Sequence, residues 1–501
     1  CDMAKDEETP LLSKRPDTVC IRNSRLFLAV FSAVLGNFSF GYSMVYPSPV
    51  LPVLQGPDAD PRLKMDTPEA ALFGSIYTLG AAAGGLGAML FNDVLGRKMS
   101  IMLSAVPSYM LMGGASNRSM LYVGRFLTGL AGGMTSASIP VYISEISHKR
   151  VRGALGSCPQ ITSVAGALTL YALGLWVPWR WLAIAGGVPA LLMVTLLCCM
   201  PSSPRRLLSL GREEKAEQAL RWLRGPDYDV NPELSAIQHS VNMQSTVTFS
   251  QLATPVYYKP ILISVGMRFL QQMTGITPIL IYLQTIFAKS KVSLPPEYDA
   301  ALVGAVRLVS VLVAACLMDK AGRKALLYTS SMLMFLSSLT LTITSHTTPC
   351  PNPPNSTALF YNSQNALVSG TTGASPSDTS LIPVVSTMVF ILGEAMGWGP
   401  ITWLLMSEVL PLAARGVASG LCVTVSWLTA FALTHAFTHL LDLGLYVPYL
   451  LFTVVCVLCL LFNAVCIPET RGRSLEEIEN YFRTGRSFTI GSRSTSLLES
   501  T

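Results

Sequence analysis

Charged side chains are scarce in this chain. Lys, Arg, Asp and Glu make up 13% of its 501 residues and apolar residues make up 50%, whereas soluble domains carry roughly 25% charged residues. A soluble fold could not bury so many apolar side chains, so the composition excludes an ordinary water-soluble domain. The net charge of +6 is small, and nothing in its pattern predicts a nucleic-acid partner.

Long apolar stretches fill most of the chain instead. They lie near residues 26–50, 70–91, 99–116, 120–140, 154–175 and 181–200, and again near 260–288, 299–318, 325–345, 381–406, 416–440 and 447–467. Each can cross a hydrocarbon core of about 30 Å, which needs roughly 20 helical residues. Because lipid offers no partner to backbone N–H and C=O groups, each stretch must be a helix. The sequence predicts an all-α membrane protein with twelve transmembrane helices.

Three sequence signatures occur twice. Asp93-Val-Leu-Gly-Arg-Lys98 returns as Asp319-Lys-Ala-Gly-Arg-Lys324, and the spacing of Glu145 and Arg152 returns in Glu408 and Arg415. Pro201-Ser-Ser-Pro-Arg205 has its counterpart in Pro468-Glu-Thr-Arg-Gly472. Such internal repeats are typical of secondary transporters. We therefore expect two six-helix halves, 25–200 and 260–467. A cytoplasmic linker with surface helices, 201–259, should join them, and 1–24 and 468–501 should be cytoplasmic tails.

Basic residues gather on one side of the predicted spans, which makes that side cytoplasmic by the positive-inside rule. The loop at 346–380 then lies outside the cytoplasm. It contains the sequon Asn355-Ser-Thr357, on the side where an N-glycan can be attached. We expect Asn355 to be glycosylated.

Eleven cysteines do not predict a disulfide framework, because only Cys350 falls clearly on the noncytoplasmic side. His435 and His439 are spaced as a metal-binding pair, but the sequence offers no third ligand. We expect no metal, no cofactor and no enzymatic activity.

Glycine and proline interrupt corresponding spans of the two halves, which predicts a solute site near mid-membrane. The breaks include Pro47 in the first span, Gly275 and Pro278 in the seventh, and Gly397 and Pro400 in the tenth. Uncharged polar groups there suit solute hydroxyls, and tryptophan offers an apolar ring face. The candidates are Gln160, Gln271, Gln272, Thr277, Ser426, Thr429, Trp403 and Trp427. Glutamine can instead hold helices together, and that alternative stays open.

The paired motifs resemble the sugar-porter branch of the major facilitator superfamily over residues 25–485. Pro140-Val-Tyr-Ile-Ser-Glu145, Gln271-Gln272, Gly397-Trp-Gly-Pro-Ile-Thr-Trp403 and Pro468-Glu-Thr470 are similar to motifs of the facilitative glucose transporter family. The short first outer loop and the long ninth loop resemble its class III members. The resemblance implies a major facilitator fold and facilitative transport of a hexose, glucose first, by alternating access.

The same resemblance assigns a cytoplasmic gate to seven charged residues: Arg97, Glu145, Arg152, Asp319, Arg323, Glu408 and Arg415. Arginines and carboxylates near cytoplasmic helix ends can form ion pairs. We expect these pairs to tie the two halves together when the cytoplasmic mouth is closed. The alternative is that the charges only set the membrane topology.

Four positions depart from the family pattern. Well-studied members have asparagine where this chain has Thr277, Arg307 and Ala430, and glutamate where it has Ala395. Arg307 lies about 18 Å from the cytoplasmic end of its helix, near the membrane centre. Burial there costs at least roughly 3 kcal/mol. We expect Arg307 to pair with Glu394 or to face the cavity as a solute-binding residue.

Proton-coupled members of this branch carry an aspartate after the Phe-Gly-Tyr of the first span, whereas Phe40-Gly-Tyr42 is followed here by Ser43. This difference predicts a uniporter. Two alternatives stay open: a proton-coupled sugar symporter, which Glu394 could serve, and a sugar-sensing membrane protein with vestigial transport.

The N-terminal tail contains Glu7-Glu-Thr-Pro-Leu11-Leu12, which fits an acidic dileucine sorting signal formed by Glu7, Leu11 and Leu12. It predicts a lysosomal or endosomal membrane, with the plasma membrane as the alternative. The expected partners are a small-molecule sugar, the lipid bilayer and a clathrin adaptor, and we expect a monomer.

Overall fold

The computed structural model describes residues 23–104, 108–148, 151–226, 228–242, 254–290, 294–347, 381–410, 415–470, 478 and 481–482, apart from the side chains at 93, 152–153, 256, 318–319, 407 and 415–417. The first half contains α1 (Ser24–Met44), α2 (Pro47–Gln55), α3 (Thr67–Val94), α4 (Arg97–Leu103), α5 (Ser108–Gly113), α6 (Arg118–Ile146), α7 (Arg152–Leu173) and α8 (Trp179–Cys198). Three short helices follow: α9 (Pro204–Ser209), α10 (Glu213–Arg224) and α11 (Asn231–Asn242). The second half contains α12 (Pro255–Met273), α13 (Ile276–Ile281), α14 (Leu283–Lys289), α15 (Pro296–Ala321), α16 (Arg323–Thr347), α18 (Ile382–Met396), α19 (Trp398–Val409), α20 (Arg415–Leu443) and α21 (Tyr446–Val465).

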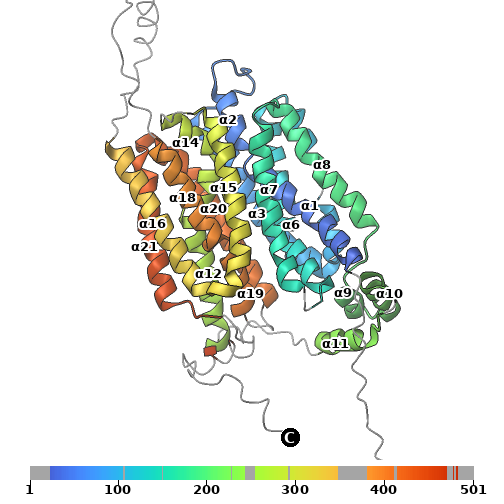
Figure 1. The fold of residues 1–501 in the computed structure, drawn as a ribbon. Helices are drawn as coiled ribbons and strands as arrows, with labels where there is room; N and C mark the ends of the chain where they lie inside the picture. The colour runs from blue at the N-terminus through green and yellow to red at the C-terminus, as the bar shows by residue number, and fades with distance from the viewer. Residues whose placement is uncertain are drawn as a thin grey trace, which may run out of the picture.

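The helices form two bundles side by side, with α1–α8 in one and α12–α21 in the other (Figure 1). Nine helices in the described part of the chain are long and apolar enough to cross a membrane. The three other predicted spans correspond to the pair α4 and α5, to α7, and to the run α12–α14. The predicted all-α membrane fold is confirmed.

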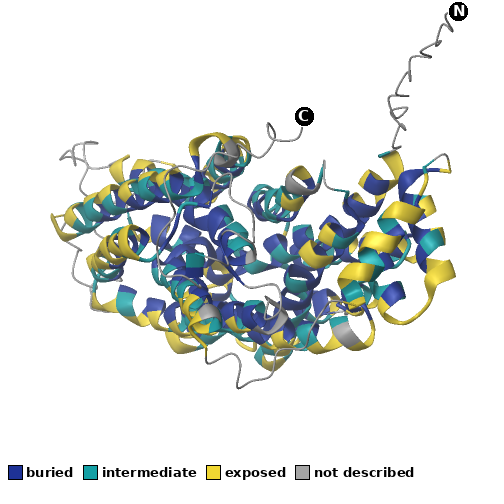
Figure 2. Cartoon of the chain, turned by 90° about the horizontal axis from the view of Figure 1, so that it is seen from below, coloured by how far each residue is buried: buried dark blue, intermediate teal, exposed yellow. Residues whose placement is uncertain are grey.

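The outer surface of the bundles is apolar. Leu90, Leu191 and Val465 are 71%, 68% and 63% exposed, and exposed positions surround a buried centre in the end-on view of Figure 2. Soluble monomers rarely expose many large apolar side chains together. The exposed face is therefore the one that contacts lipid.

Within the first half, α3 and α6 touch backbone to backbone. A methyl group added at Gly129 or Gly133 of α6 would collide with the carbonyl oxygens of Tyr77 and Ala81 on α3. Small residues four apart let membrane helices approach this closely. These glycines are therefore needed for helix packing.

Three predicted spans are interrupted where the sequence places glycine or proline. α1 ends before Pro47, α12 ends before Gly275, which has φ of +87°, and α18 ends before Gly397. Each break leaves the next helix free to take a different direction. The predicted solute site lies around the second and third breaks.

The two halves meet along α3 and α20, and they are also joined by hydrogen bonds near one end of the bundles. Tyr171 of α7 donates a hydrogen bond to the carbonyl of Leu280 at 2.8 Å, and the amide of Gln284 donates to Ser48 Oγ of α2 at 3.3 Å. These two hydrogen bonds thus join the halves at this end of the bundles.

The segment between the halves begins with three short helices. Ala216, Leu220 and Leu223 of α10 are buried, and Arg224 donates to the carbonyl of Ile146, at the end of α6, at 2.9 Å. In Figure 1, α9, α10 and α11 lie below the first bundle.

Candidate functional site

The first half of the predicted gate is an ion pair between α4 and α6. Gly96 has φ of +89°, a conformation that favours glycine, and turns the chain so that Arg97 begins α4. Arg97 Nε lies 3.1 Å from Glu145 Oε1, and both side chains are largely buried. Ser203 donates a hydrogen bond to the other carboxylate oxygen of Glu145.

The second half repeats this arrangement. Gly322 has φ of +91° and precedes Arg323, the first residue of α16. Arg323 Nη2 lies 3.3 Å from Glu408 Oε1, and Thr470 donates to Glu408 Oε2 at 2.6 Å. Ser203 and Thr470 each come two residues after the proline of the third repeated signature. All three repeated signatures therefore meet in one cluster in each half.

Each of these ion pairs lies within one half of the molecule: Arg97 and Glu145 belong to the first, Arg323 and Glu408 to the second. In this structure neither pair joins the halves, because the first turn of α4 or α16 faces a helix of its own bundle. That the gate residues tie the halves together when the cytoplasmic mouth is closed stays a prediction. The side chains of Arg152, Asp319 and Arg415 lie outside the described residues.

Near mid-membrane, three predicted solute-binding residues form a polar chain. Thr277 donates to Gln272 Oε1 at 2.7 Å, and Gln272 Nε2 donates to Ser426 Oγ at 3.2 Å. All three are at least 95% buried. This chain is uncharged and joins α12, α13 and α20.

The polar chain lies beside an aromatic contact between the two halves. Trp427, the residue after Ser426, packs edge to face on Phe40 of α1 with ring centroids 5.6 Å apart. Its Nε1 is buried without a hydrogen-bond partner. Gln160 of α7 is half-buried. An unpaired donor and apolar ring faces next to uncharged polar groups suit a sugar.

Arg268 is a buried residue that the sequence analysis missed. It is 1% exposed, it donates from Nη1 to Gln271 Oε1 and, at 3.3 Å, to Thr402 Oγ1, and its Cζ lies 3.9 Å from the centroid of the Trp403 ring. Gln271 and Trp403, both predicted to bind solute, are thus engaged by an arginine of the protein itself. Its place inside a predicted span, three residues before Gln271, was the signal that could have revealed it.

Arg307 and Glu394 do not form a direct ion pair. Glu394 is 2% exposed and its Oε2 has no hydrogen-bond partner, whereas Arg307 is half-buried. Glu394 interacts electrostatically with Arg307 and, more weakly, with Arg268. The buried carboxylate therefore lies near two cations but contacts neither.

A second missed arginine, Arg125 of α6, is fully buried next to the position of the absent aspartate. It donates to the backbone carbonyl of Ser43 and lies 4.6 Å from the Tyr77 ring centroid and 5.5 Å from that of Phe73. Its Nε and Nη2 have no hydrogen-bond partner. At position 43 the sequence supplies a hydroxyl, which donates to the carbonyl of Ser39 at 2.8 Å.

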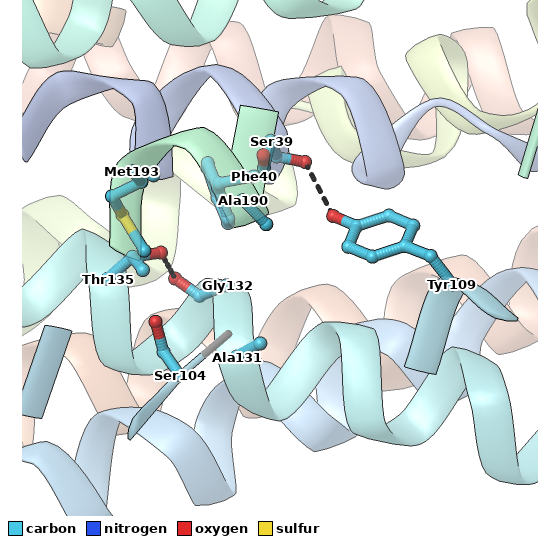
Figure 3. Close-up of a pocket in the computed structure, with 10 residues that line it drawn as sticks. Ser39, Phe40, Ser104, Tyr109, Ala131, Gly132, Thr135, Ala190 and Met193 are labelled. Carbon is cyan, nitrogen blue, oxygen red and sulfur yellow. Dashed lines mark hydrogen bonds between the residues drawn. The ribbon is translucent and has the colours of Figure 1, made fainter. Parts of the chain in front are cut away.

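A small cavity of about 20 Å³ lies in the first half, with Phe40 in its wall (Figure 3). Ser39, Phe40, Tyr109 and Thr135 line it, and Ser39 Oγ has no hydrogen-bond partner. The cavity has room for one water molecule.

The remaining sequence predictions concern residues outside the solute site and the gate. The His435 and His439 rings are 6.0 Å apart, and no group of three possible metal ligands exists among the described residues. Glu7, Leu11, Leu12 and Asn355 lie outside the described residues.

Comparison with known proteins identifies the family. The family described as "Sugar (and other) transporter" matches residues 29–482. Solute carrier family 2, facilitated glucose transporter member 6 from Homo sapiens is 55% identical over 97% of this chain and 96% of that protein, and member 6 from Mus musculus is 58% identical over 93% of each. Member 8 from Bos taurus is 39% identical over 95% and 98%.

A solved structure matches the fold. The proton:xylose symporter XylE of the major facilitator superfamily, bound to 6-bromo-6-deoxy-D-glucose, aligns with a TM-score of 0.71 and 23% identity, over 92% of this chain and all of that one. The two chains share a fold. The matched family and the relatives are transporters and not enzymes. This chain therefore belongs to the sugar transporter family, among the facilitated glucose transporters of solute carrier family 2.

Proposed function

We propose that this protein transports a hexose, with glucose as the first candidate, by uniport and alternating access. The observation that carries the proposal is the uncharged chain of Thr277, Gln272 and Ser426 beside Trp427. Neutral donors and acceptors match the hydroxyls of a neutral sugar, and the indole face matches its C–H groups. Gln160, Gln271, Trp403 and Arg307 complete the proposed solute site.

Alternating access is supported by the contacts between halves. Phe40 of the first half touches Trp427 of the second beside the polar chain, and Tyr171 and Leu280 join the halves at the extracytoplasmic side. A solute bound between the halves can leave by either side only if one set of contacts opens while the other closes. The seven gate residues, with Arg97–Glu145 and Arg323–Glu408 at their centre, bias that balance at the cytoplasmic side.

Uniport is supported by the absence of a carboxylate at Ser43. Arg125 contacts the backbone carbonyl of Ser43 rather than an acidic side chain. A proton-coupled carrier needs a group that binds a proton in step with solute, and this position has none.

Two alternatives each have one observation in their favour. Glu394 is buried with an unpaired carboxylate oxygen, which favours proton-coupled symport. Arg268 engages Gln271 and Trp403, which favours a sugar sensor with vestigial transport. Saturable flux that is insensitive to a proton ionophore would exclude both.

The acidic dileucine sequence of Glu7, Leu11 and Leu12 supports a lysosomal or endosomal location reached through a clathrin adaptor. Replacing Leu11→Ala together with Leu12→Ala should move the protein to the cell surface, and an unchanged distribution would show that the motif is idle. Asn355 is the proposed glycan site, and we take the working unit to be a monomer.

The surface-directed variant also allows the solute to be identified. Uptake of labelled hexoses, pentoses and polyols is measured in cells that express it, with Gln272→Ala as the site control. The proposal expects saturable hexose uptake that the control loses. Uptake of a polyol or pentose alone, or equal uptake by the control, would contradict it.

A further inference from the structure

Two adjacent cysteines lie at the cytoplasmic end of α8. Cys198 is the last residue of the helix and Cys199 is its C-cap, and both are exposed free thiols. Neither belongs to the solute site or the gate. Cys422, Cys456 and Cys459 are buried, whereas Cys316 of α15 is exposed but single.

The cysteine pair ends a stripe of exposed apolar residues. Val188, Leu191 and Leu192 of α8 are 63%, 68% and 44% exposed. Leu191 and Cys198 are seven residues apart, as are Leu192 and Cys199, so each pair lies on one face two turns apart. The two thiols therefore border the lipid-facing surface of the helix.

Lys98 marks the depth of this helix end in the membrane. Its Nζ donates to the carbonyl oxygens of Met200 at 2.7 Å and Cys198 at 3.3 Å. A lysine ammonium at the end of an apolar helix lies at the level of the lipid headgroups. The neighbouring thiols lie at that level too, where a membrane-dissolved fatty acyl donor can reach them.

The second half supplies a matched comparison. Cys466 is the C-cap of α21, and Lys324 Nζ donates to the carbonyl oxygens of Ile467 at 2.9 Å and Ala464 at 3.4 Å. The lysine arrangement is therefore repeated, but Cys466 is single and half-buried. The two sites differ in how exposed their thiols are and in how many thiols they have.

We propose that Cys198 and Cys199 are a site of S-acylation by long-chain fatty acids. The cysteine sulfur attacks the thioester carbonyl of a fatty acyl-coenzyme A and forms a new carbon–sulfur bond. The bond to the coenzyme A sulfur breaks, and coenzyme A leaves as a thiol that takes up the proton released by the cysteine. No electrons are transferred, and the acyl chain extends along the apolar face of α8 into the leaflet.

The inference does not depend on which solute is carried. The test uses the full chain expressed in cells, with hydroxylamine-dependent exchange of each acyl group for a mass tag. Wild-type protein should show species with one and two tags. Cys198→Ser and Cys199→Ser should each remove one tag, and the double variant should remove both, whereas Cys466→Ser should keep the wild-type pattern.

Three results would overturn the proposal: no hydroxylamine-dependent tag on the wild type, the same tags in the double variant, or the same loss in Cys466→Ser. The elution profile in size-exclusion chromatography checks that each serine variant is folded. Because both thiols are exposed, we expect that profile to be unchanged.

Discussion

Arg268 lies over the ring of Trp403, with its guanidinium carbon 3.9 Å from the ring centroid. A desolvated contact of this kind stabilises by about 2 kcal/mol. The same guanidinium donates to Gln271, so a buried cation engages an acceptor and an aromatic face that the proposed sugar would use. Arg268 and the sugar should therefore compete.

Replacing Arg268→Gln should raise the apparent affinity for glucose. The shorter neutral side chain frees Gln271 and the Trp403 face, and a hydrogen bond from a charged donor corresponds to roughly 1.5 kcal/mol, or about tenfold in affinity. KM for glucose uptake is the measurement. Arg268→Lys keeps the charge but loses the planar stacking group. Its KM should lie between that of the wild type and that of Arg268→Gln. A higher KM in a variant with unchanged thermal stability would contradict the competition.

Breaking either gate ion pair should destabilise the protein. Glu145→Gln and Glu408→Gln each leave a largely buried arginine without its charged partner, at a cost of about 2 kcal/mol. Thermal unfolding of the purified protein measures this. Glu217→Gln, whose partner Arg221 is 57% exposed, is the control and should change stability by less than about 0.5 kcal/mol. Equal effects at the gate and on α10 would show that the gate pairs contribute no more than a surface pair.

A methyl group at Gly129 should force α3 and α6 apart. Gly129→Ala places a Cβ against the Tyr77 carbonyl, and overpacking of this kind costs about 1–3 kcal/mol. Gly156→Ala on α7 is the control, because a Cβ there meets nothing within 4 Å. A lower melting temperature is expected for the first variant only, and equal melting temperatures would contradict the close packing.

Introducing a carboxylate beside Arg125 should make uptake depend on pH. Ser43→Asp puts an acidic group next to Arg125, whose Nε and Nη2 have no hydrogen-bond partner, and protonation of that group would change the net charge of this buried site. Uptake between pH 5 and pH 8 is compared with that of Ser43→Asn, which matches the shape without the charge. A flat profile for both variants would mean that Ser43 has no influence on coupling.

The helices and their breaks could be predicted because their signals are local. Apolar length indicates the spans, and Gly275 and Gly397 interrupt helices where they occur. The gate residues could be found because the signatures around Arg97 and Arg323 repeat. Which helices the ion pairs join could not be predicted from the sequence, because that depends on how the bundles pack.

The role of Arg268 could not be predicted from the periodicity of the sequence alone either. An arginine in a span can face lipid headgroups, a carboxylate or an aromatic ring, and only the packing of α12 against α19 brings it onto Trp403. The pairing of Arg307 with Glu394 was inferred from depth in the membrane, which fixes the height of a residue but not the direction of its side chain.

The most direct test of the uniport proposal is the initial rate of D-glucose uptake into proteoliposomes that contain the purified protein, with and without a proton ionophore under an imposed pH gradient. We expect saturable uptake, selective for D-glucose over L-glucose, at the same rate in both conditions. Uptake that falls when the ionophore is added, or protein that is folded but gives no saturable flux, would contradict it.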